Sequence, residues 1–325
     1  MIPNLTKDIN LAIKCLQNGE LVAFPSETVY GLAADASNDL AIAKVFQVKG
    51  RPSDHPLILH ISSVEQLGLW AVDIPESAWL LARHFWPGPL TLILKKRPEV
   101  SKLITGGQDT IAIRIPNHPL TLDLLIQLGS AVVGPSANKY GRVSPTTAEH
   151  VAADLGSEVA AILDGGPCSI GIESTIVQLA SAKPMIMRQG AITAQQLSAV
   201  LGCDLQLRPE LNNTVRTSGS DESHYAPLTP VYLVASDKLI NQSSRFATQQ
   251  QQISVLSFIA KPLNLSSAVY WQQIPKDPLI YAHDLYANLR AHDQLGNTAI
   301  IIEQVPNDSQ WLAIMDRLIR ASSKE

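Results

Sequence analysis

The feature that most constrains the fold is an apolar strand that runs into a polar stretch and then into one helix. Residues 21–24 are apolar and predict a buried strand. The polar stretch that follows supplies a carboxylate, two hydroxyls and a phenol, and one helix later come Lys49 and Arg51. A lysine gives a compact charge and an arginine a planar fork, a pair suited to phosphate or carboxylate. The combination predicts a small-molecule site rather than core packing.

Length and charge limit the class of protein. A chain of 325 residues is long for a single core, so two domains are expected. Its 46% apolar content supplies material for a sizeable core. The 25 basic and 29 acidic residues leave a net charge of -4, which argues against a protein that coats nucleic acid or an anionic membrane. A local basic pocket remains compatible with this balance.

The cysteines and the N-terminal segment predict the compartment. Cys15, Cys168 and Cys203 are scattered and form neither a CxxC pair nor a zinc-binding spacing. The first residues lack a basic segment followed by an apolar one, and no apolar run is long enough to span a bilayer. We therefore expect a soluble, reduced, cytoplasmic protein with no membrane partner.

Strands and helices are interleaved through residues 1–207. Thr6 is expected to cap a helix that ends near Asn18. Two short apolar segments, 174–179 and 184–188, are separated by a four-residue loop and predict a hairpin. Further strands are expected at 57–61, 90–94, 110–115, 131–133 and 160–163, and further helices at 38–49, 64–70, 77–85, 120–128, 147–155 and 193–201. This mixture predicts a twisted mixed α/β sheet.

A second pattern begins after a polar linker at 208–230. The periodicity predicts strands at 231–235, 253–258 and 298–305 and helices at 279–295 and 311–321. Repeated strand–helix alternation predicts a small parallel, Rossmann-like domain at 231–325.

Each candidate motif also has a structural interpretation. Lys49 and Arg51 could form an ordinary solvated helix terminus, where cations favour the helix dipole. Arg114 stands in an apolar strand and must meet a carboxylate, which either the protein or a ligand could supply. The turns at 133–138 and 141–147 could cradle an anion, or their Ser and Thr residues could simply cap helices.

Motifs that the chain lacks narrow the chemistry. The sequence contains no Gly-x4-Gly-Lys-Ser/Thr loop, no GxGxxG and no GxSxG elbow. No nucleophile stands next to an evident base. These absences favour catalysis by positioning and electrostatics over a covalent enzyme intermediate.

Several motifs, in this order and spacing, resemble the Sua5/YrdC/YciO family, the threonylcarbamoyl-AMP synthases of tRNA modification. They are Phe-Pro-Ser-Glu-Thr-Val-Tyr-Gly-Leu at 24–32, Lys-Gly-Arg-Pro at 49–52, His-Pro-Leu at 55–57, Pro-Ser-Ala-Asn at 135–138, Ser-Pro-Thr at 144–146, Ile-Glu-Ser-Thr at 172–175 and Arg-Gln-Gly at 188–190. The segment 285–321 resembles the extra domain of the long, Sua5-type members. The likeness spans nearly the whole chain and is loosest at 231–278.

The resemblance implies a YrdC-like catalytic domain, a Sua5-type C-terminal domain and a reaction. L-Threonine would take up bicarbonate to form a carbamate, which attacks the α-phosphorus of ATP and expels pyrophosphate. The product, threonylcarbamoyl-AMP, would pass to other proteins that modify tRNA. Mg²⁺ is the expected companion of the triphosphate. Direct binding of tRNA is compatible with the family but weakly supported.

The resemblance also implies roles by position. Lys49 and Arg51 would hold phosphates and act as the catalytic cations. The remaining positions on the ATP side are His55, Thr110, Ser136, Asn138, Ser144, Arg188 and Tyr225. The threonine positions are Thr28, Tyr30, His60, Arg114, Gly134 and Ser174.

The sequence departs from the family pattern in three places. His55 stands where asparagine is common, and Tyr140 replaces a small residue. Residues 218–223 replace a stretch that carries two cations with one that carries two acids, which should weaken any phosphate contact there.

Two alternatives remain open at this level. A concave cationic sheet could bind RNA or a ribosome without synthase activity, although a net charge of -4 and the lack of interleaved aromatic and basic residues count against it. A related carbamoyl-transfer enzyme could use another acceptor. Dependence on threonine would separate that enzyme from the synthase.

Overall fold

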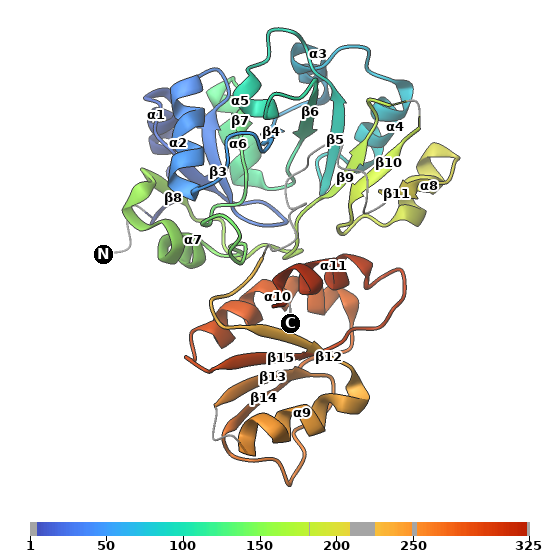
Figure 1. The fold of residues 1–325 in the computed structure, drawn as a ribbon. Coiled ribbons are helices and arrows are strands. Elements are labelled where there is room, and N and C mark those ends of the chain that lie inside the picture. The colour runs from blue at the N-terminus through green and yellow to red at the C-terminus, as the bar shows by residue number, and fades with distance from the viewer. Residues whose placement is uncertain (1–4, 182, 209–224, 249–251, 324–325) are drawn as a thin grey trace. The chain divides into compact units, whose positions relative to one another are not determined.

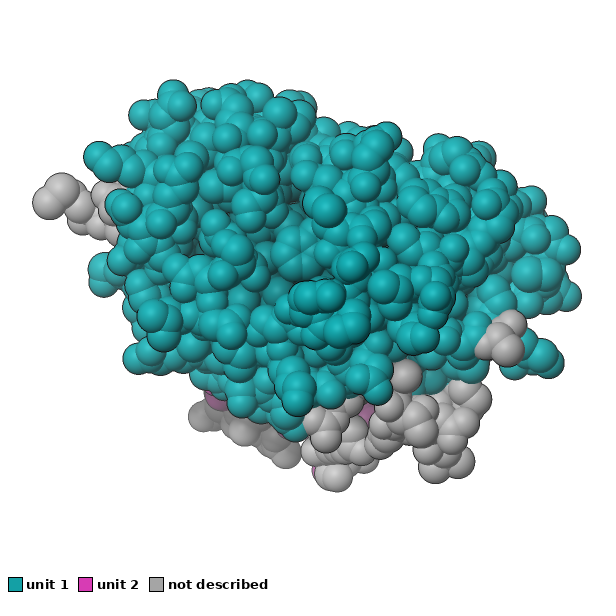
Figure 2. Space-filling view, turned by 90° about the horizontal axis from the view of Figure 1, so that it is seen from above, with its two compact units in different colours: residues 1–140, 144–220 teal, residues 141–143, 221–325 magenta. Residues whose placement is uncertain are grey.

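The computed structural model describes residues 5–181, 183–208, 225–248 and 252–323 (Figure 1). The chain divides into two compact units, which Figure 2 colours teal and magenta. The first unit comprises residues 1–140 and 144–220, and the second comprises 141–143 and 221–325. Most of the predicted linker, residues 209–224, lies outside the described residues, and so does the divergent segment 218–223.

The first unit is built on a sheet of eleven strands in the order β1-β8-β2-β3-β7-β4-β6-β5-β9-β10-β11. Parallel pairs such as β4 with β6 alternate with antiparallel pairs such as β5 with β6, so the predicted mixed sheet is confirmed. The strands are β1 (Leu5–Thr6), β2 (Val22–Phe24), β3 (Gly31–Asp35), β4 (Ile58–His60), β5 (Leu90–Lys95), β6 (Thr110–Arg114), β7 (Val132–Val133), β8 (Ala161–Leu163), β9 (Thr175–Gln178), β10 (Met185–Arg188) and β11 (Gln206–Leu207).

The helices of this unit lie where the periodicity places them, except α5, which was not predicted. They are α1 (Ile9–Gln17), α2 (Asp39–Lys49), α3 (Leu67–Trp70) after the 3-10 turn η1 (Val64–Gln66), α4 (Glu76–Phe85), α5 (Lys102–Thr105), α6 (Pro119–Leu128), α7 (Ala148–Leu155) followed by η2 (Gly156–Glu158), and α8 (Ala194–Leu201). The predicted cap of α1 is wrong. Asp8 caps this helix by accepting from the amides of Asn10 and Leu11, because Thr6 is already in β1 and paired with β8.

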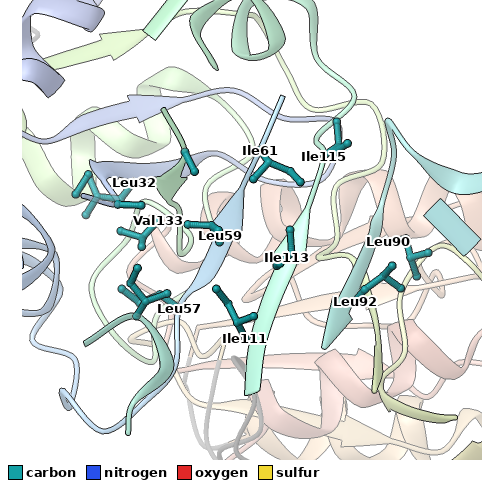
Figure 3. Packing of buried hydrophobic residues seen from close by; sticks show 14 of the residues in the cluster. Leu32, Leu57, Leu59, Ile61, Leu90, Leu92, Ile111, Ile113, Ile115 and Val133 are labelled. Carbon is teal, nitrogen blue, oxygen red and sulfur yellow. The ribbon is translucent and has the colours of Figure 1, made fainter. Parts of the chain in front are cut away.

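The sheet carries apolar clusters on its two faces, because successive residues of a strand point to opposite sides. The larger cluster includes Leu59 of β4, Leu92 of β5 and Ile113 of β6, which point to the same side in Figure 3. Helices α2, α4, α7 and α8 pack on this side. On the other side, α1 and α6 cover residues such as Val22 and Phe24 of β2.

One central strand, β3, was not predicted from the sequence. It pairs antiparallel with β2 on one side and with β7 on the other. The polar stretch at 25–30 is therefore the loop of a β2–β3 hairpin, and Ser26, Glu27 and Thr28 are buried in the middle of the sheet. This hairpin fixes the position of the first motif.

The second unit contains a four-stranded parallel sheet in the order β12-β15-β13-β14, as the predicted Rossmann-like alternation requires. Its elements are β12 (Val231–Val234), α9 (Ser236–Thr248), β13 (Ile253–Ser257), β14 (Val269–Gln273), α10 (Pro278–Asp293), β15 (Ala299–Glu303) and α11 (Leu312–Ala321). Helix α9 and strand β14 were not predicted. None of the helices in the described ranges combines the length and apolar character that a membrane span requires.

The short segment 141–143 packs with the second unit although it is distant from it in sequence. The amide of Ala226 donates to the carbonyl of Gly141 over 3.0 Å, and Arg142 forms a β-bridge with Ala226. Arg290 of α10 donates to the carbonyl of Val143. The chain therefore contributes to the second unit twice.

Candidate active site

Lys49, the last residue of α2, is buried rather than solvated. Its side chain is 2% exposed, and its Nζ donates to the carbonyls of Ser136 and Asn138 over 2.5 and 2.6 Å. Gly50 ends the helix in the left-handed conformation, with a φ of 64°. Burial, reinforced by the nearby charge of Arg51, holds the pKa of Lys49 well below its usual range. The interpretation of this turn as an ordinary solvated helix end is therefore wrong.

Arg51 is held beside Lys49 by a carbonyl and an aromatic ring. Its Nη2 donates to the carbonyl of Pro56 over 3.0 Å, and its guanidinium carbon lies 5.6 Å from the ring centre of Tyr140. The hydroxyl of Tyr140 lies 3.2 Å from Nδ1 of His55. His55 and Tyr140, which both depart from the family pattern, thus contact each other. Lys49, Arg51, His55, Ser136 and Asn138 form one connected group around Tyr140.

Arg114, the last residue of β6, meets a carboxylate of the protein. Its Nη2 lies 2.7 Å from Oε1 of Glu27, and each side chain is 5% exposed. Its Nη1 donates to Oγ1 of Thr28 over 2.9 Å, and its Nε donates to the carbonyl of Gly88 over 3.2 Å. Of the two sources left open by the sequence, the protein thus supplies one. The contact leaves Thr28 and Arg114 side by side.

His60 and Gly134 adjoin Arg114. His60 is the register partner of Arg114 on the neighbouring parallel strand β4. Burial, and then the charge of Arg114, lowers the pKa of His60 to about 3, so the imidazole is neutral. A Cβ on Gly134 would lie 2.7 Å from Nδ1 of His60, which shows how closely this backbone approaches the ring. Gly134 is two residues before Ser136, so the groups around Arg114 and Lys49 are neighbours along the chain.

Ser174 and Arg188 form a third group at the start of β9 and the end of β10. Arg188 donates from Nε to the carbonyl of Ser174 and from Nη2 to its Oγ, both over 3.1 Å. The same hydroxyl lies 2.8 Å from Oγ1 of Thr91 in β5. Next to Ser174 in the chain, Glu173 accepts from Oγ of Ser144 over 2.6 Å. The β9–β10 hairpin therefore brings Ser174 and Arg188 together.

His60 and Arg114 share one face of the sheet. Ile58 and Ala112 belong to a small cluster on the side opposite the large core, and His60 and Arg114 lie two residues further along the same strands. Because side chains alternate, His60 and Arg114 point to this side as well. His60 and Arg114 therefore point away from the large apolar cluster.

In the first unit, cations outnumber carboxylates among the buried charged side chains that the structure describes. Among the described residues of the first unit, the buried charged side chains are four cations and two carboxylates, which leaves an excess of two positive charges (four minus two). The cations are Lys49, Arg51, Arg114 and Arg188, and the carboxylates are Glu27 and Glu173. Several buried cations close to one another suit an anionic ligand.

The remaining predicted residues are Tyr30, Thr110 and Tyr225. The hydroxyl of Tyr30 donates to the carbonyl of Gly166 and accepts from the amide of Gly165. Thr110 begins β6, about 13 Å along the strand from Arg114 at a rise of about 3.3 Å per residue. Tyr225 is buried in the second unit, where its ring stacks on Tyr286 with a centroid distance of 5.6 Å.

No site role was predicted for three residues that contact predicted site residues. Glu27 pairs with Arg114, Glu173 accepts from Ser144, and Thr91 contacts Ser174. Glu27 and Glu173 are inside quoted motifs, so a search for carboxylates beside each candidate cation could have found them. Thr91 belongs to an ordinary apolar strand and carries no such signal.

Within the described ranges, no cluster of three or more His, Cys, Asp or Glu side chains could hold a metal ion. The oxygen atoms that accept from Nζ of Lys49 are backbone carbonyls. All three cysteines are free thiols, and burial raises the pKa of Cys168 to about 12.

The fold defines an α/β protein of two compact units, the first of which buries several cationic side chains. Residues 14–190 match the model of the Sua5/YciO/YrdC family, described as "Telomere recombination". Residues 192–323 match the model described as the C-terminal domain of threonylcarbamoyl-AMP synthase. The chain belongs to the Sua5/YciO/YrdC family, in the form that carries this C-terminal domain.

Full-length relatives share both parts. A protein of Bacillus subtilis (strain 168), named threonylcarbamoyl-AMP synthase, is 40% identical over 319 residues, covering 96% of this chain and 92% of the relative. One of Pyrococcus abyssi with the same name is 37% identical over 324 residues, covering 97% and 94%. The crystal structure of P. abyssi Sua5 complexed with L-threonine superposes with a TM-score of 0.90 at 36% identity, over 99% of this chain and 97% of that one.

Proposed function

We propose that this protein is an L-threonylcarbamoyladenylate synthase, an ATP-dependent nucleotidyltransferase. The amine of L-threonine combines with bicarbonate and loses water to give a carbamate. A carbamate oxygen then bonds to the α-phosphorus of ATP, and the bond to the bridging oxygen breaks to release pyrophosphate. The names of the full-length relatives and the threonine complex of P. abyssi Sua5 support this assignment.

The observation that carries the proposal is the excess of buried positive charge in the first unit. Four buried cations face only two buried carboxylates among its described residues. A triphosphate would compensate this excess, and the reaction would further concentrate negative charge on the departing pyrophosphate. The site requires no covalent intermediate, since its cations can act by positioning and by electrostatic stabilisation.

The group around Lys49 and the group around Arg114 suggest separate binding sites for ATP and threonine. Lys49 and Arg51 would hold phosphates, with Ser136 and Asn138 beside them. Thr28, His60 and Arg114 would receive threonine. The neutral imidazole of His60 can hydrogen-bond the substrate without adding charge, because burial and Arg114 lower its pKa to about 3.

Arg114 would then hold the threonine carboxylate while still paired with Glu27. An arginine presents five donors in a fixed fork, so it can serve an internal and an external carboxylate at once. The contact from Nη1 to Thr28 orients this fork within the β2–β3 loop.

We further propose that Mg²⁺ enters with ATP. The carbonyls of Ser136 and Asn138 and the hydroxyl of Ser144 are hard oxygen donors of the kind that this ion accepts. Mg²⁺ usually keeps several waters and binds through substrate phosphates, which agrees with a described site of few carboxylates. When bound, the ion would neutralise phosphate charge.

The proposal also covers the cellular compartment of the protein and the proteins that use its product. Free thiols at all three cysteines support a cytoplasmic protein. The activated product would be consumed by proteins that transfer the threonylcarbamoyl group to tRNA adenosine. The net charge of -4 gives no support to a dominant role for tRNA binding by this chain itself.

Pyrophosphate release from ATP tests the function directly. The full chain should release pyrophosphate only when threonine and bicarbonate are both present, and mass spectrometry should detect threonylcarbamoyl-AMP. Release that ignores threonine would refute the substrate assignment and favour another carbamoyl acceptor. Salt-dependent binding of tRNA without turnover of ATP would favour the RNA-binding alternative.

Arg51→Ala supplies the matching variant. It should abolish ATP binding measured by calorimetry, because it removes the planar fork that we assign to the phosphates. Arg83→Ala is the control, since Arg83 is an exposed arginine that pairs with Glu76 at the surface. Equal ATP affinities in the two variants would remove Arg51 from the nucleotide site.

A further inference from the structure

Tyr140 contacts three separate candidate residues of the nucleotide group. Its backbone amide donates to the carbonyl of Lys49 over 2.8 Å. Its ring lies under the guanidinium of Arg51 at 5.6 Å, and its hydroxyl lies 3.2 Å from Nδ1 of His55. The rings of His55 and Tyr140 also pack edge to face, with centroids 5.7 Å apart and an interplanar angle of 81°. The roles proposed above do not include this tyrosine.

The Arg51 contact is the one with consequences for binding. An arginine side chain loses much rotamer freedom when a ligand fixes it, and that loss weakens binding. A ring beneath the guanidinium and the carbonyl of Pro56 at one edge hold the fork before any ligand arrives. The ring still leaves donors of the guanidinium fork available, because stacking uses the face of the group and not its N–H bonds.

The His55 contact fixes the ring itself. His55 follows Arg51 in the same turn, and its amide donates to the carbonyl of Pro52 over 3.2 Å. The imidazole therefore belongs to the turn that carries Arg51, whereas Tyr140 comes from the segment after β7. Edge-to-face packing and the hydroxyl contact lock the orientation of the Tyr140 ring against that turn.

We propose that Tyr140 is a positioning residue for ATP, which holds the guanidinium of Arg51 in the orientation that binds phosphate while His55 fixes the tyrosine ring. This inference rests on the proposed function, since it assigns Arg51 to the nucleotide. It is specific to ATP, because none of the three contacts involves the group around Arg114.

Two substitutions separate the ring from the hydroxyl. Tyr140→Leu removes the stacking surface and should weaken ATP binding about 3- to 10-fold, the range expected for a partly buried cation–π contact. Tyr140→Phe keeps the ring and should stay within about 2-fold of the wild type, since the edge-to-face contact with His55 survives. The affinity for threonine should stay unchanged in both. A loss as large in Tyr140→Phe as in Tyr140→Leu would overturn the stacking argument.

A double-mutant cycle shows whether Tyr140 acts through Arg51. Arg51→Lys keeps a charge but removes the planar fork, so Tyr140→Leu should cost less in that background than in the wild type. An equal loss in both backgrounds would mean that Tyr140 does not act through Arg51. In steady-state assays, the change should fall on KM for ATP more than on kcat, as expected for a loss of preorganised binding.

The second unit offers a matched control for general destabilisation. Tyr270 also stands edge to face with a histidine, His292, at 5.4 Å. Tyr270→Leu should therefore remove a similar pair without changing ATP binding. If ATP and threonine affinities fall together in Tyr140→Leu, in step with the unfolding temperature, the role is only structural. If the wild type itself binds no ATP, the proposed function fails instead.

Discussion

Arg114 and Glu27 form a buried ion pair across the middle of the sheet, with 2.7 Å between Nη2 and Oε1. The two residues come from the end of β6 and from the β2–β3 loop. The other carboxylate oxygen of Glu27 accepts from the amide of Asn117 over 3.0 Å, so the carboxylate is fixed from both sides. A threonine carboxylate in this site would therefore meet an arginine whose direction is already set.

This pair predicts an asymmetric response to substitution. Arg114→Ala should lower the free energy of unfolding by about 3–5 kcal/mol, because it leaves the carboxylate of Glu27 buried and unpaired. The double variant Glu27→Gln/Arg114→Met should recover part of that loss. Denaturant unfolding of both variants measures the difference. Equal losses would show that the unpaired carboxylate of Glu27 does not cause the destabilisation.

Arg114→Ala should also weaken threonine more than ATP, in calorimetry at a temperature where the variant is folded. Arg97→Ala controls for removal of an arginine, since Arg97 pairs with Glu99 at the surface. If Arg114→Ala leaves the affinity for threonine unchanged, the ion pair between Arg114 and Glu27 stabilises the fold and does not bind threonine.

The depressed pKa of Lys49 predicts a pH dependence of ATP binding. Burial and Arg51 lower this pKa, so the amine loses its positive charge at a lower pH than an ordinary lysine, whose pKa is about 10.4. ATP affinity should therefore fall as the pH rises through this lowered pKa. Lys49→Met should bind weakly at every pH and lose this dependence. Lys44→Ala, on the exposed side of the same helix, should retain it.

Calorimetry in buffers of different ionisation enthalpy gives an independent measurement. The phosphate charge would favour the charged form of Lys49, so ATP binding should take up protons on the alkaline side of its pKa. Proton uptake that persists in Lys49→Met would place the titrating group elsewhere.

The backbone at Gly134 predicts a steric effect. A Cβ there would lie 2.7 Å from Nδ1 of His60 and 2.7 Å from Cζ of Phe24. Gly134→Ala should therefore cost about 1–3 kcal/mol of stability and displace the imidazole, with weaker threonine binding. Gly68→Ala is the control, because nothing lies within 4 Å of a Cβ at that helical position. A Gly134→Ala variant as stable as the control would mean that the ring moves freely.

Two neutral histidines predict a loss of stability in acid. Burial lowers the pKa of His292 to about 4, and burial with the charge of Arg114 lowers that of His60 to about 3, from an ordinary value of 6.5. Between the folded and unfolded values, the unfolded chain binds more protons, so stability rises with pH in this window. The free energy of unfolding should thus fall as the pH drops below about 6.5.

His292→Gln should flatten this pH dependence, because it removes one of the two histidines that must take up protons on unfolding. Denaturant titrations at several pH values provide the slopes. Parallel slopes for the wild type and His292→Gln would contradict the assignment of His292.

Local patterns were enough to predict most elements of the first unit. Asn38 caps α2, and Thr193 caps α8 through a capping box with Gln196, because these short side chains satisfy free amides at a helix start. The antiparallel pairing of β9 with β10 follows from a short loop between apolar segments. These features depend on residues close in sequence.

Features that depend on distant residues were not predicted. Strand β3 consists of small apolar residues without alternation, so its central place in the sheet is set by β2 and β7. Helix α9 is strongly polar and lies in the stretch with the loosest family likeness. The Glu27–Arg114 pair joins residues from two separate elements, and the sequence could state only that Arg114 needs an anion.

Residues 141–143 belong to the second unit, so deletion of the C-terminal part of the chain would also affect them. Tyr140 and Ser144 flank this segment, and its anchors are Ala226 and Arg290. A stop codon after residue 207 would delete both anchors while sparing every strand and helix of the first unit. Such a truncation would leave the segment between Tyr140 and Ser144 without the backbone contacts that Ala226 and Arg290 supply.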